Sequence, residues 1–243
     1  TGAKNTKKYA REKDLITELI QQLPKGYSID LYLDHNCDYL FPFYWNGFSL
    51  QLNYSYRLEA INDPDLLWSG LADNIRTEIK KAQKIVKVED NHSVDDLIAM
   101  QDKTFARQGR EFDSNRDLLL RLDQALIDHN ARKLLCAVDD NGKIHAAAYF
   151  VYDKNCCYYL IGGGDPKLRN SGSASLLMWE GIKFASTVSE SFDFEGSMIE
   201  SIERFFRGFG GVPTPYWRVT RLSGPLKMCE YLKPKVKRIL GWK

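Results

Sequence analysis

One stretch restricts the folds open to this chain more than any other: IGGGDPKLRNSGSASLL, residues 161–177. An apolar run ends in three glycines, a short loop follows, and a helix begins with small residues. Glycine lets the backbone approach a ligand closely, and a helix N-terminus presents unpaired N–H groups and a favourable dipole to an anion. A strand, loop and helix in this order can therefore cradle a pyrophosphate. A helix that only needs small residues at its start gives the same local pattern.

The residues around this stretch alternate between strand and helix patterns. Residues 132–163 have a two-residue periodicity and predict three antiparallel strands, with turns at Asp139–Gly142 and Asp153–Asn155. Further on come a helix over 171–187, a strand at SFDFEG, a short helix at SIERFFRGFG and a strand at PYWRVTRL. Together with the preceding segments, the elements from Lys87 onward are expected in the order β, α, α, β, β, β, α, β, α, β.

The N-terminal part of the chain is richer in aromatic residues. Residues 9–23 predict an amphipathic helix, and residues 27–33 predict a strand. In FPFYWNGFSL, the pair Asn46-Gly47 is typical of a hairpin turn between two strands. A long helical pattern follows, with Asp63 as the expected cap of a helix that continues to about Ile85.

Charge is nearly balanced over the whole chain but is unevenly distributed. The formal net charge is +2, so no overall field argues for a nucleic-acid partner. Basic residues gather near both ends, in KNTKKYAREK and KPKVKRILGWK. Such ends are either solvated or in contact with an anionic partner such as phospholipid, RNA or a phosphorylated substrate. No run approaches the ~20 apolar residues of a membrane span, so any membrane contact is expected to be peripheral, through the basic C-terminal segment.

The cysteines indicate a reduced protein without a structural metal. There are 5 cysteines and no C-x-x-C pair, so neither a zinc site nor a disulfide framework is expected. Reduced thiols in a cytoplasmic protein are the simplest account. The chain starts at Thr1 without a methionine, so we expect the native N-terminus to lie further upstream.

The six residues of the loop fit a known motif. Residues Arg169 to Ala174 read RNSGSA and follow the pattern Q/R-x-x-G-x-G/A. This run resembles the loop that binds the pyrophosphate of coenzyme A in the GNAT (GCN5-related) acetyltransferases, and the resemblance covers about residues 58–222. It implies a donor such as acetyl-CoA or another acyl-CoA, with loop N–H groups facing phosphate oxygens and a bidentate contact from the arginine. The loop residues implicated are Arg169, Asn170, Ser171, Gly172, Ser173 and Ala174.

Several other segments resemble one branch of this superfamily. NIRTEIKKAQK, LLMWEGIKFA and FDFEGSMIESIERFFRGFGG look like uncharacterised acetyltransferases related to the Fem peptidyltransferases, which transfer amino acids from aminoacyl-tRNA to peptidoglycan precursors. The resemblance implies an α/β fold with a mixed, mostly antiparallel central sheet flanked by helices. Because the branch usually carries two GNAT modules, we expect the tail of a first module at 1–57. A GNAT-like acyltransferase domain is expected at 58–222, and a basic C-terminal helix at 223–243.

The resemblance also implies where the chemistry takes place. In the GNAT fold the fourth strand splays from the fifth, and the acyl carbonyl lies in the gap, so backbone N–H groups near Ile161 and Gly162 are expected to polarise it. An amine nucleophile must lose a proton, commonly to a carboxylate beside the cleft. Asp193 and Glu195 lie two apart on the expected fifth strand and would share one face. They are the candidate bases, with Glu195 preferred, and solvent exposure of both is the alternative.

The expected proton donor is missing from the sequence. Many GNAT enzymes place a tyrosine on the helix after the fifth strand, where it protonates the departing thiolate. The segment FFRGFG puts Phe206 at that position. Tyr216 or Tyr159 could substitute as the catalytic acid, and water is the alternative.

An acceptor pocket for an anionic substrate is suggested by a second group of residues. The cationic and polar candidates are Arg107, Gln108 and Arg110 at a helix end, together with Arg204 and Arg207.

Three functions follow from the sequence. The first is an acyl-CoA-dependent N-acyltransferase, most simply one that acetylates an amine by direct attack. The second is an aminoacyl-tRNA-dependent peptidyltransferase of the Fem type acting on a peptidoglycan precursor, with tRNA as a partner. The third is a non-catalytic GNAT-like binding module, which Phe206 and the incomplete first module favour.

Overall fold

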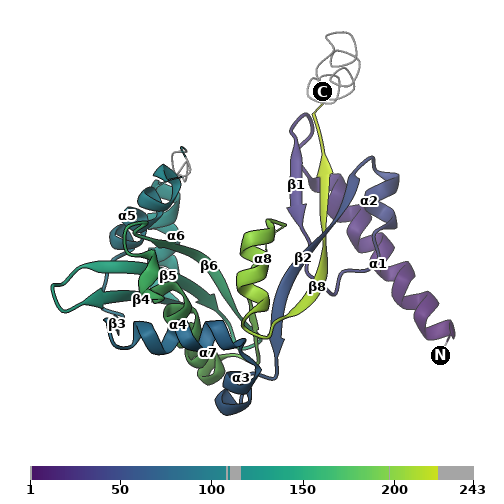
Figure 1. Ribbon diagram of the computed structural model, residues 1–243. Coiled ribbons are helices and arrows are strands. Elements are labelled where there is room, and N and C mark those ends of the chain that lie inside the picture. The colour runs from purple at the N-terminus through teal and green to yellow at the C-terminus, as the bar shows by residue number, and fades with distance from the viewer. Residues whose placement is uncertain (1, 108, 110–115, 197, 224–243) are drawn as a thin grey trace, which may run out of the picture. The chain divides into compact units, whose positions relative to one another are not determined.

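The computed structural model describes residues 2–107, 109, 116–196 and 198–223 (Figure 1). The chain divides into two compact units, one formed by Thr1–Tyr54 with Thr214–Lys243 and the other by Ser55–Pro213. The modules expected at 1–57, 58–222 and 223–243 stay a prediction, and the basic helix expected at the C-terminus falls outside the described residues. None of the described helices combines the length and the apolar character needed to cross a membrane.

The first unit packs helices against a short piece of sheet. Its elements are α1 (Gly2–Gln22), β1 (Ile29–Tyr32), α2 (Phe41–Trp45), the start of β2 (Ser49–Glu59) and the end of β8 (Val212–Arg221). β1 runs antiparallel to β8, from the pair Ile29 and Arg221 to the pair Tyr32 and Arg218. A small apolar core holds it together, formed by Ile20, Leu40, Phe43, Phe48 and Val219.

The hairpin predicted at Asn46-Gly47 is wrong. The preceding segment is the helix α2, with Pro42 in its first turn, where a missing N–H costs nothing. Asn46 caps the C-terminus of α2, its Nδ2 donates to the carbonyl of Pro42 at 2.7 Å, and Gly47 has φ +76°. An Asn-Gly pair provides the positive φ that both a hairpin turn and the end of a helix require. In this chain the pair ends a helix.

The second unit is built on a mixed sheet. The hydrogen-bonded order of its strands is the end of β2, then β7 (Ser191–Asp193), β6 (Cys156–Gly164), β5 (Ile144–Tyr152), β4 (Arg132–Asp139) and β3 (Val86–Glu89). Neighbouring strands run antiparallel except β6 and β7, which are parallel. The expected fold class, a mixed and mostly antiparallel sheet flanked by helices, is confirmed.

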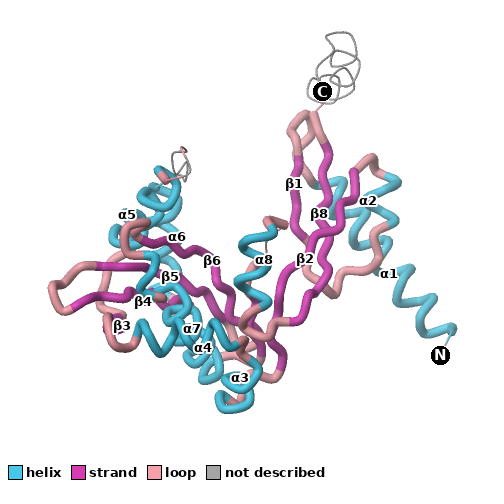
Figure 2. The backbone as a smooth tube through the Cα atoms, in the orientation of Figure 1, coloured by secondary structure: helices cyan, strands magenta, loops and turns pink. Residues whose placement is uncertain are grey.

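Helices cover both faces of this sheet (Figures 1 and 2). Ala146, Ala148 and Phe150 of β5 belong to the larger core with α4 and α7, whereas Ala147 and Tyr149 belong to the core under α5 and α6. This alternation is the two-residue period of a strand buried on both sides. The bounds of the helices are α3 Pro64–Gly70, α4 Asp73–Ala82, α5 Val94–Ala106, α6 Arg116–Asp128, the 3-10 turn η1 Arg169–Ser171, α7 Ser173–Val188 and α8 Glu200–Arg207.

The predicted cap is correct, but the predicted helix is split. The Asp63 carboxylate accepts from the N–H groups of Asp65 and Leu66 at the start of α3, as expected. The long helix predicted up to Ile85 is broken after Gly70, and α4 starts at Asp73. The Arg76 guanidinium donates to the carbonyl of Ser69 at the end of α3, at 3.1 Å, and to that of Leu71 in the break, at 2.5 Å. These carbonyls are therefore satisfied although the helix is interrupted.

Strand β6 carries the irregularity that prepares the site. On β5, Tyr149 pairs with Ile161 and the next residue, Phe150, pairs with Tyr159, so Leu160 is an extra residue in β6. Such a bulge bends a strand and re-aims its side chains. On its other edge β6 pairs with β7 only over Cys156–Tyr158. From Tyr159 onward, β6 therefore leaves its neighbour, as a splayed pair requires.

The packing of α7 on β5 predicts that Gly181→Ala destabilises the protein. A Cβ atom at Gly181 would lie 2.1 Å from Cζ of the fully buried Phe150. Overpacking of this kind typically costs about 1–3 kcal/mol. Gly70→Ala is the control, because a Cβ there meets no atom within 4 Å. Urea denaturation should show a loss for the first variant and none for the second, and equal midpoints would contradict the packing.

Candidate functional site

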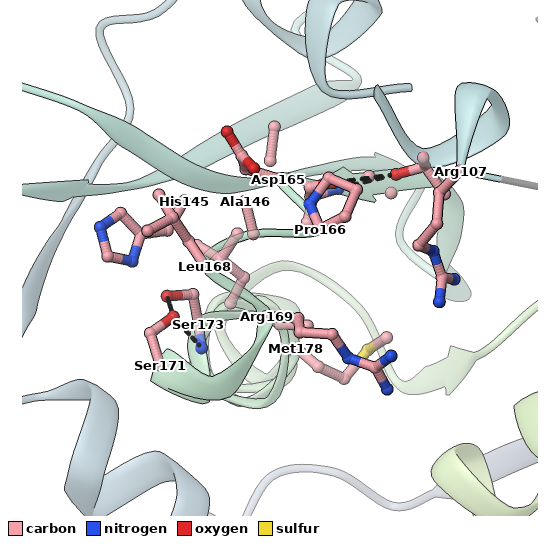
Figure 3. Close-up of a pocket in the computed structure, with 18 of the residues that line it drawn as sticks. Arg107, His145, Ala146, Asp165, Pro166, Leu168, Arg169, Ser171, Ser173 and Met178 are labelled. Atoms are coloured by element: carbon pink, nitrogen blue, oxygen red, sulfur yellow. Dashed lines mark hydrogen bonds between the residues drawn. The ribbon is translucent and has the colours of Figure 1, made fainter. Parts of the chain in front are cut away.

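A cavity of about 260 Å³ lies where β6 ends and α7 begins (Figure 3). We call it cavity A. Its wall combines the glycine end of β6, the middle of β5 and the first turn of α7 with the loop that joins them. The residues that line it include Thr104, Arg107, His145, Ala146, Ala148, Tyr159, Gly162, Gly163, Gly164, Asp165, Arg169, Ser171, Ser173, Ala174, Leu177 and Met178.

The loop before α7 is held by α4. Gly172 has φ +78°, and a Cβ there would lie 2.5 Å from the backbone oxygen of Glu78 in α4. The Lys81 ammonium hydrogen-bonds the carbonyl of Asn170, and the hydroxyls of Ser171 and Ser173 share a 2.6 Å hydrogen bond. Gly172 is therefore required by its conformation and by close packing on α4, independently of any ligand.

Four of the six predicted loop residues line cavity A. These are Arg169, Ser171, Ser173 and Ala174. Asn170 and Gly172 lie against α4 instead. The first turn of α7 opens onto this cavity, and the N–H groups at the start of a helix have no partner within the helix. They and the helix dipole favour an anion at this point.

Two arginines flank the same cavity. In Figure 3 the side chains of Arg107 and Arg169 reach toward the same side of the cavity from its two walls. Neither guanidinium forms an ion pair with a carboxylate in the part of the chain that the structure describes. Arg107 thus lies with the predicted donor loop and not with Arg204 and Arg207. Gln108 and Arg110, predicted beside it, lie outside the described residues.

A second cavity of about 400 Å³, which we call cavity B, opens between β6, the end of β7 and α8. It contains the predicted carbonyl-polarising positions Ile161 and Gly162. The complete lining is Tyr159, Leu160, Ile161, Gly162, Phe194, Glu195, Gly196, Ser201, Ile202, Phe205 and Phe206. Tyr159 and Gly162 line both cavities, so the two cavities meet at these residues.

Tyr159 stands at this junction. Its hydroxyl lies over Gly162, where a Cβ atom would be 1.6 Å from the oxygen, and its ring meets the ring of Phe206 edge-on at 6.1 Å. The hydroxyl has no hydrogen-bond partner among the described residues. Burial raises the pKa of Tyr159 to about 12, so the hydroxyl keeps its proton at neutral pH. It is a free donor between the two cavities.

Asp193 lies apart from both cavities and is paired with an arginine. β7 ends at this residue, whose side chain is buried and accepts from Arg57 Nη1 at 2.9 Å, from the Ser55 hydroxyl and from the N–H of Glu195 at 2.8 Å. Burial opposes the charge of Arg57, but hydrogen bonds from Arg57 to Glu59 and Asp193 raise its pKa. Asp193 is therefore a buried partner of Arg57 and lines neither cavity.

Glu195 reaches cavity B by a different geometry from the predicted one. The sequence predicts Glu195 on the same strand as Asp193, but β7 ends at Asp193. The φ of Glu195 is +57°, in the left-handed region, so its backbone is not extended. The Asp193 carboxylate accepts its N–H and so holds this turn. Glu195 is open to solvent on one side, yet partial burial in the cavity, with the nearby Asp193 charge, raises its pKa. A carboxylate with a raised pKa at a cavity wall is suited to accept a proton.

The remaining predicted residues lie elsewhere. Tyr216 belongs to β8 in the first unit, where its ring packs 6.2 Å from that of Tyr32. Arg204 and Arg207 lie on α8 but line neither cavity, and Arg207 pairs with Glu203 at 2.9 Å. Within residues 2–107, 109, 116–196 and 198–223, no group of three or more His, Cys, Asp or Glu side chains is arranged to hold a metal ion.

Sequence reasoning missed Arg57. It lies 136 residues from Asp193 along the chain, and an arginine in a strand pattern gives no local signal that it is buried. The sequence signal that could have indicated a buried cation is Asp193, which lies between two phenylalanines on a short strand. If that strand is central, its carboxylate is buried and needs a partner.

The buried pair predicts a large effect of removing one partner. Asp193→Ala would remove the buried carboxylate that pairs with Arg57 and leave its guanidinium only the exposed carboxylate of Glu59. Breaking a buried pair typically costs about 3–5 kcal/mol. Asp140→Ala is the control, because its pair with Lys87 is exposed and such pairs contribute only about 0–1 kcal/mol. Chemical denaturation measures both. A loss below about 1 kcal/mol for Asp193→Ala would contradict a stabilising role of the Arg57–Asp193 pair.

The sequence was compared with models of protein families and with curated proteins. Residues 69–197, more than half of the chain, match the family model described as an acetyltransferase (GNAT) domain. No curated protein sequence matches the chain.

Solved structures share the fold at low sequence identity. The chain superposes on FemX with a TM-score of 0.64 and 12% identity, over 79% of this chain and 71% of that one. It superposes on L-PGS from Bacillus licheniformis with a TM-score of 0.54 and 12% identity, over 84% and 71%. A tandem GNAT protein from the clavulanic acid biosynthesis pathway gives 0.52 and 10%, over 82% of this chain and 64% of that one. The chain belongs to the acetyltransferase (GNAT) domain family, with a fold shared with FemX.

Proposed function

We propose that this protein is an acyl-CoA-dependent N-acyltransferase, most simply an acetyltransferase acting on an amine in the cytoplasm. The observation that carries the proposal is the meeting of two unlike cavities at the splayed strand β6. Cavity A offers a helix N-terminus and two arginines to an anion, and cavity B offers a single carboxylate in apolar surroundings. An acyl-CoA has an anionic end and a reactive thioester end, which suits this arrangement.

The donor is assigned to cavity A. The pyrophosphate would accept hydrogen bonds from the first turn of α7, and Arg169 and Arg107 would neutralise it from the two walls. The pantetheine arm would then follow the glycine end of β6 toward Tyr159. This places the thioester at the junction of the cavities.

The acceptor is assigned to cavity B. The amine nitrogen attacks the thioester carbon, a C–N bond forms as the C–S bond breaks, and the proton lost by nitrogen passes to Glu195 directly or through water. Backbone N–H groups near Ile161 and Gly162 would polarise the carbonyl. The coenzyme A thiolate leaves and takes up a proton to become the thiol.

Tyr159 is our candidate for the group that assists the departing sulfur. Phe206 has no hydroxyl, but the ring of Tyr159 lies against it and presents a free hydroxyl at the junction. Because its pKa is raised to about 12, Tyr159 would act mainly as a hydrogen-bond donor to the developing thiolate, with water completing the proton transfer. Tyr216, in the other unit, remains the alternative predicted from the sequence.

Two other functions stay open to experiment. An aminoacyl-tRNA-dependent peptidyltransferase acting on a peptidoglycan precursor would bind tRNA in a salt-sensitive way and bind coenzyme A weakly. A non-catalytic module would bind an acyl-CoA without transferring the acyl group. Measuring donor binding first and transfer second separates all three.

Donor binding gives the first test. We expect acetyl-CoA to raise the melting temperature of the wild-type protein and Ala174→Glu to abolish this shift. Ala174 is exposed and lines cavity A, so the new carboxylate repels the pyrophosphate while its place in the first helical turn favours folding. Ala174→Gln, similar in size and uncharged, should keep most of the shift. Absence of any shift with acetyl-CoA or free coenzyme A would refute the proposal.

The pH dependence tests Glu195. As a base it must be ionised, so kcat/KM should rise with pH through a pKa raised above its ordinary value of 4.5. Glu195→Gln should lower kcat by roughly 10²–10⁴-fold and remove this limb. An unchanged acidic limb in the variant would exclude Glu195 as the base.

The same raised pKa predicts a stability effect that needs no substrate. The folded state holds the Glu195 proton more tightly than the unfolded state, so wild-type stability falls as pH rises from 4.5 through the folded pKa. Glu195→Gln should therefore gain stability relative to wild type at neutral pH and lose this advantage in acid. The gain is expected to be small because the side chain is partly solvated.

A further inference from the structure

The walls of cavity B carry information about the acceptor. Leu160, Phe194, Ile202, Phe205 and Phe206 supply apolar side chains around its opening and floor. Glu195 carries the only charged side chain of this lining within the described residues. An acceptor that enters here meets several apolar side chains, the hydroxyls of Tyr159 and Ser201, and one carboxylate.

Helix α8 turns its charges away from the cavity. Ile202, Phe205 and Phe206 recur at helical spacing and line cavity B. The arginines on the same helix, Arg204 and Arg207, are absent from its lining, and Arg207 is paired with Glu203. No cation of α8 is thus available in this cavity to neutralise a phosphate or carboxylate, contrary to the anionic acceptor expected from the sequence.

The rim of cavity B is also apolar. Leu160 is 39% exposed and Ile202 is 37% exposed, although both line the cavity. Aliphatic side chains that are solvated on one side and face a cavity on the other gain free energy when a hydrocarbon covers them.

We propose that the acceptor is a primary amine carried on an aliphatic or aromatic hydrocarbon body. The amine lies at Glu195, and the hydrocarbon lies against Ile202, Phe205 and Leu160. This inference rests on the assignment of cavity B to the acceptor in the proposed function. It makes amino sugars and anionic peptides poor acceptors, because their several hydroxyls or carboxylates would be desolvated with few partners and no cation in the cavity lining.

Binding of simple amines tests the inference without requiring turnover. The probes are n-hexylamine, ethylamine, n-hexanoate and glucosamine, titrated by calorimetry into the protein alone and with desulfo-coenzyme A. Each buried methylene contributes roughly a fourfold gain in affinity, so hexylamine should bind at least about tenfold more tightly than ethylamine. Hexanoate and glucosamine should bind more weakly still.

A pair of variants locates the site. Ile202→Lys places an ammonium on the rim and should weaken hexylamine binding by about tenfold, from lost apolar contact and charge repulsion. Ile127→Lys is the matched control, because Ile127 is a 45% exposed isoleucine on α6 and lines neither cavity. It should leave hexylamine binding unchanged.

Each outcome bears on one of the two claims. Equal binding of ethylamine and hexylamine, preference for hexanoate or glucosamine, or an unaffected Ile202→Lys variant would overturn the acceptor class. Absence of hexylamine binding, both alone and with desulfo-coenzyme A, would also overturn it. Selective hexylamine binding in a protein that binds no acyl-CoA would support the acceptor class and refute the proposed function. Acyl-CoA binding without amine selectivity would overturn the acceptor class and leave the assignment of the donor to cavity A standing.

Discussion

The ion pair between Arg57 and Asp193 sets the geometry around the site. A carboxylate at the end of a central strand is costly to bury, and the guanidinium at 2.9 Å with the Ser55 hydroxyl makes it acceptable. The remaining capacity of the Asp193 oxygens is used by the N–H of Glu195, which ends β7 and turns the chain. Because β7 stops there, β6 continues without a partner on that edge, and cavity B opens in the gap.

The second constraint is the bulge at Leu160. It lies at the point where β6 leaves β7, next to Tyr159, whose hydroxyl occupies the space that Gly162 leaves free. The proposed donor cavity and the proposed acceptor cavity adjoin at Tyr159 and Gly162, which line both. This separation suits a reaction in which a charged carrier and a less polar acceptor meet at one bond. The binding energy of each could then be used to position that bond.

Much of the fold could be predicted from the sequence because its patterns are local. The three strands β4, β5 and β6, the capped helices and the glycine-rich loop all follow from periodicity and from capping residues. Errors arose where one local pattern serves two structures, as with Asn46-Gly47 at the end of α2. They also arose where strand alternation was extended through Glu195, whose positive φ depends on a hydrogen bond from its N–H to Asp193.

The sequence by itself determined the family, the order of elements from Lys87 onward and the glycine-rich loop before a helix, because these depend on residues close together in the chain. Only the tertiary structure decided which polar groups are free. It placed Arg107 beside Arg169 at cavity A, and it paired Asp193 with Arg57 from a strand 136 residues away. The physical reason is that burial and charge pairing depend on the residues that packing brings together. Asp193 and Glu195 look alike in the sequence, where each follows a phenylalanine. In the structure Asp193 pairs with Arg57, whereas Glu195 lines cavity B and is a candidate base.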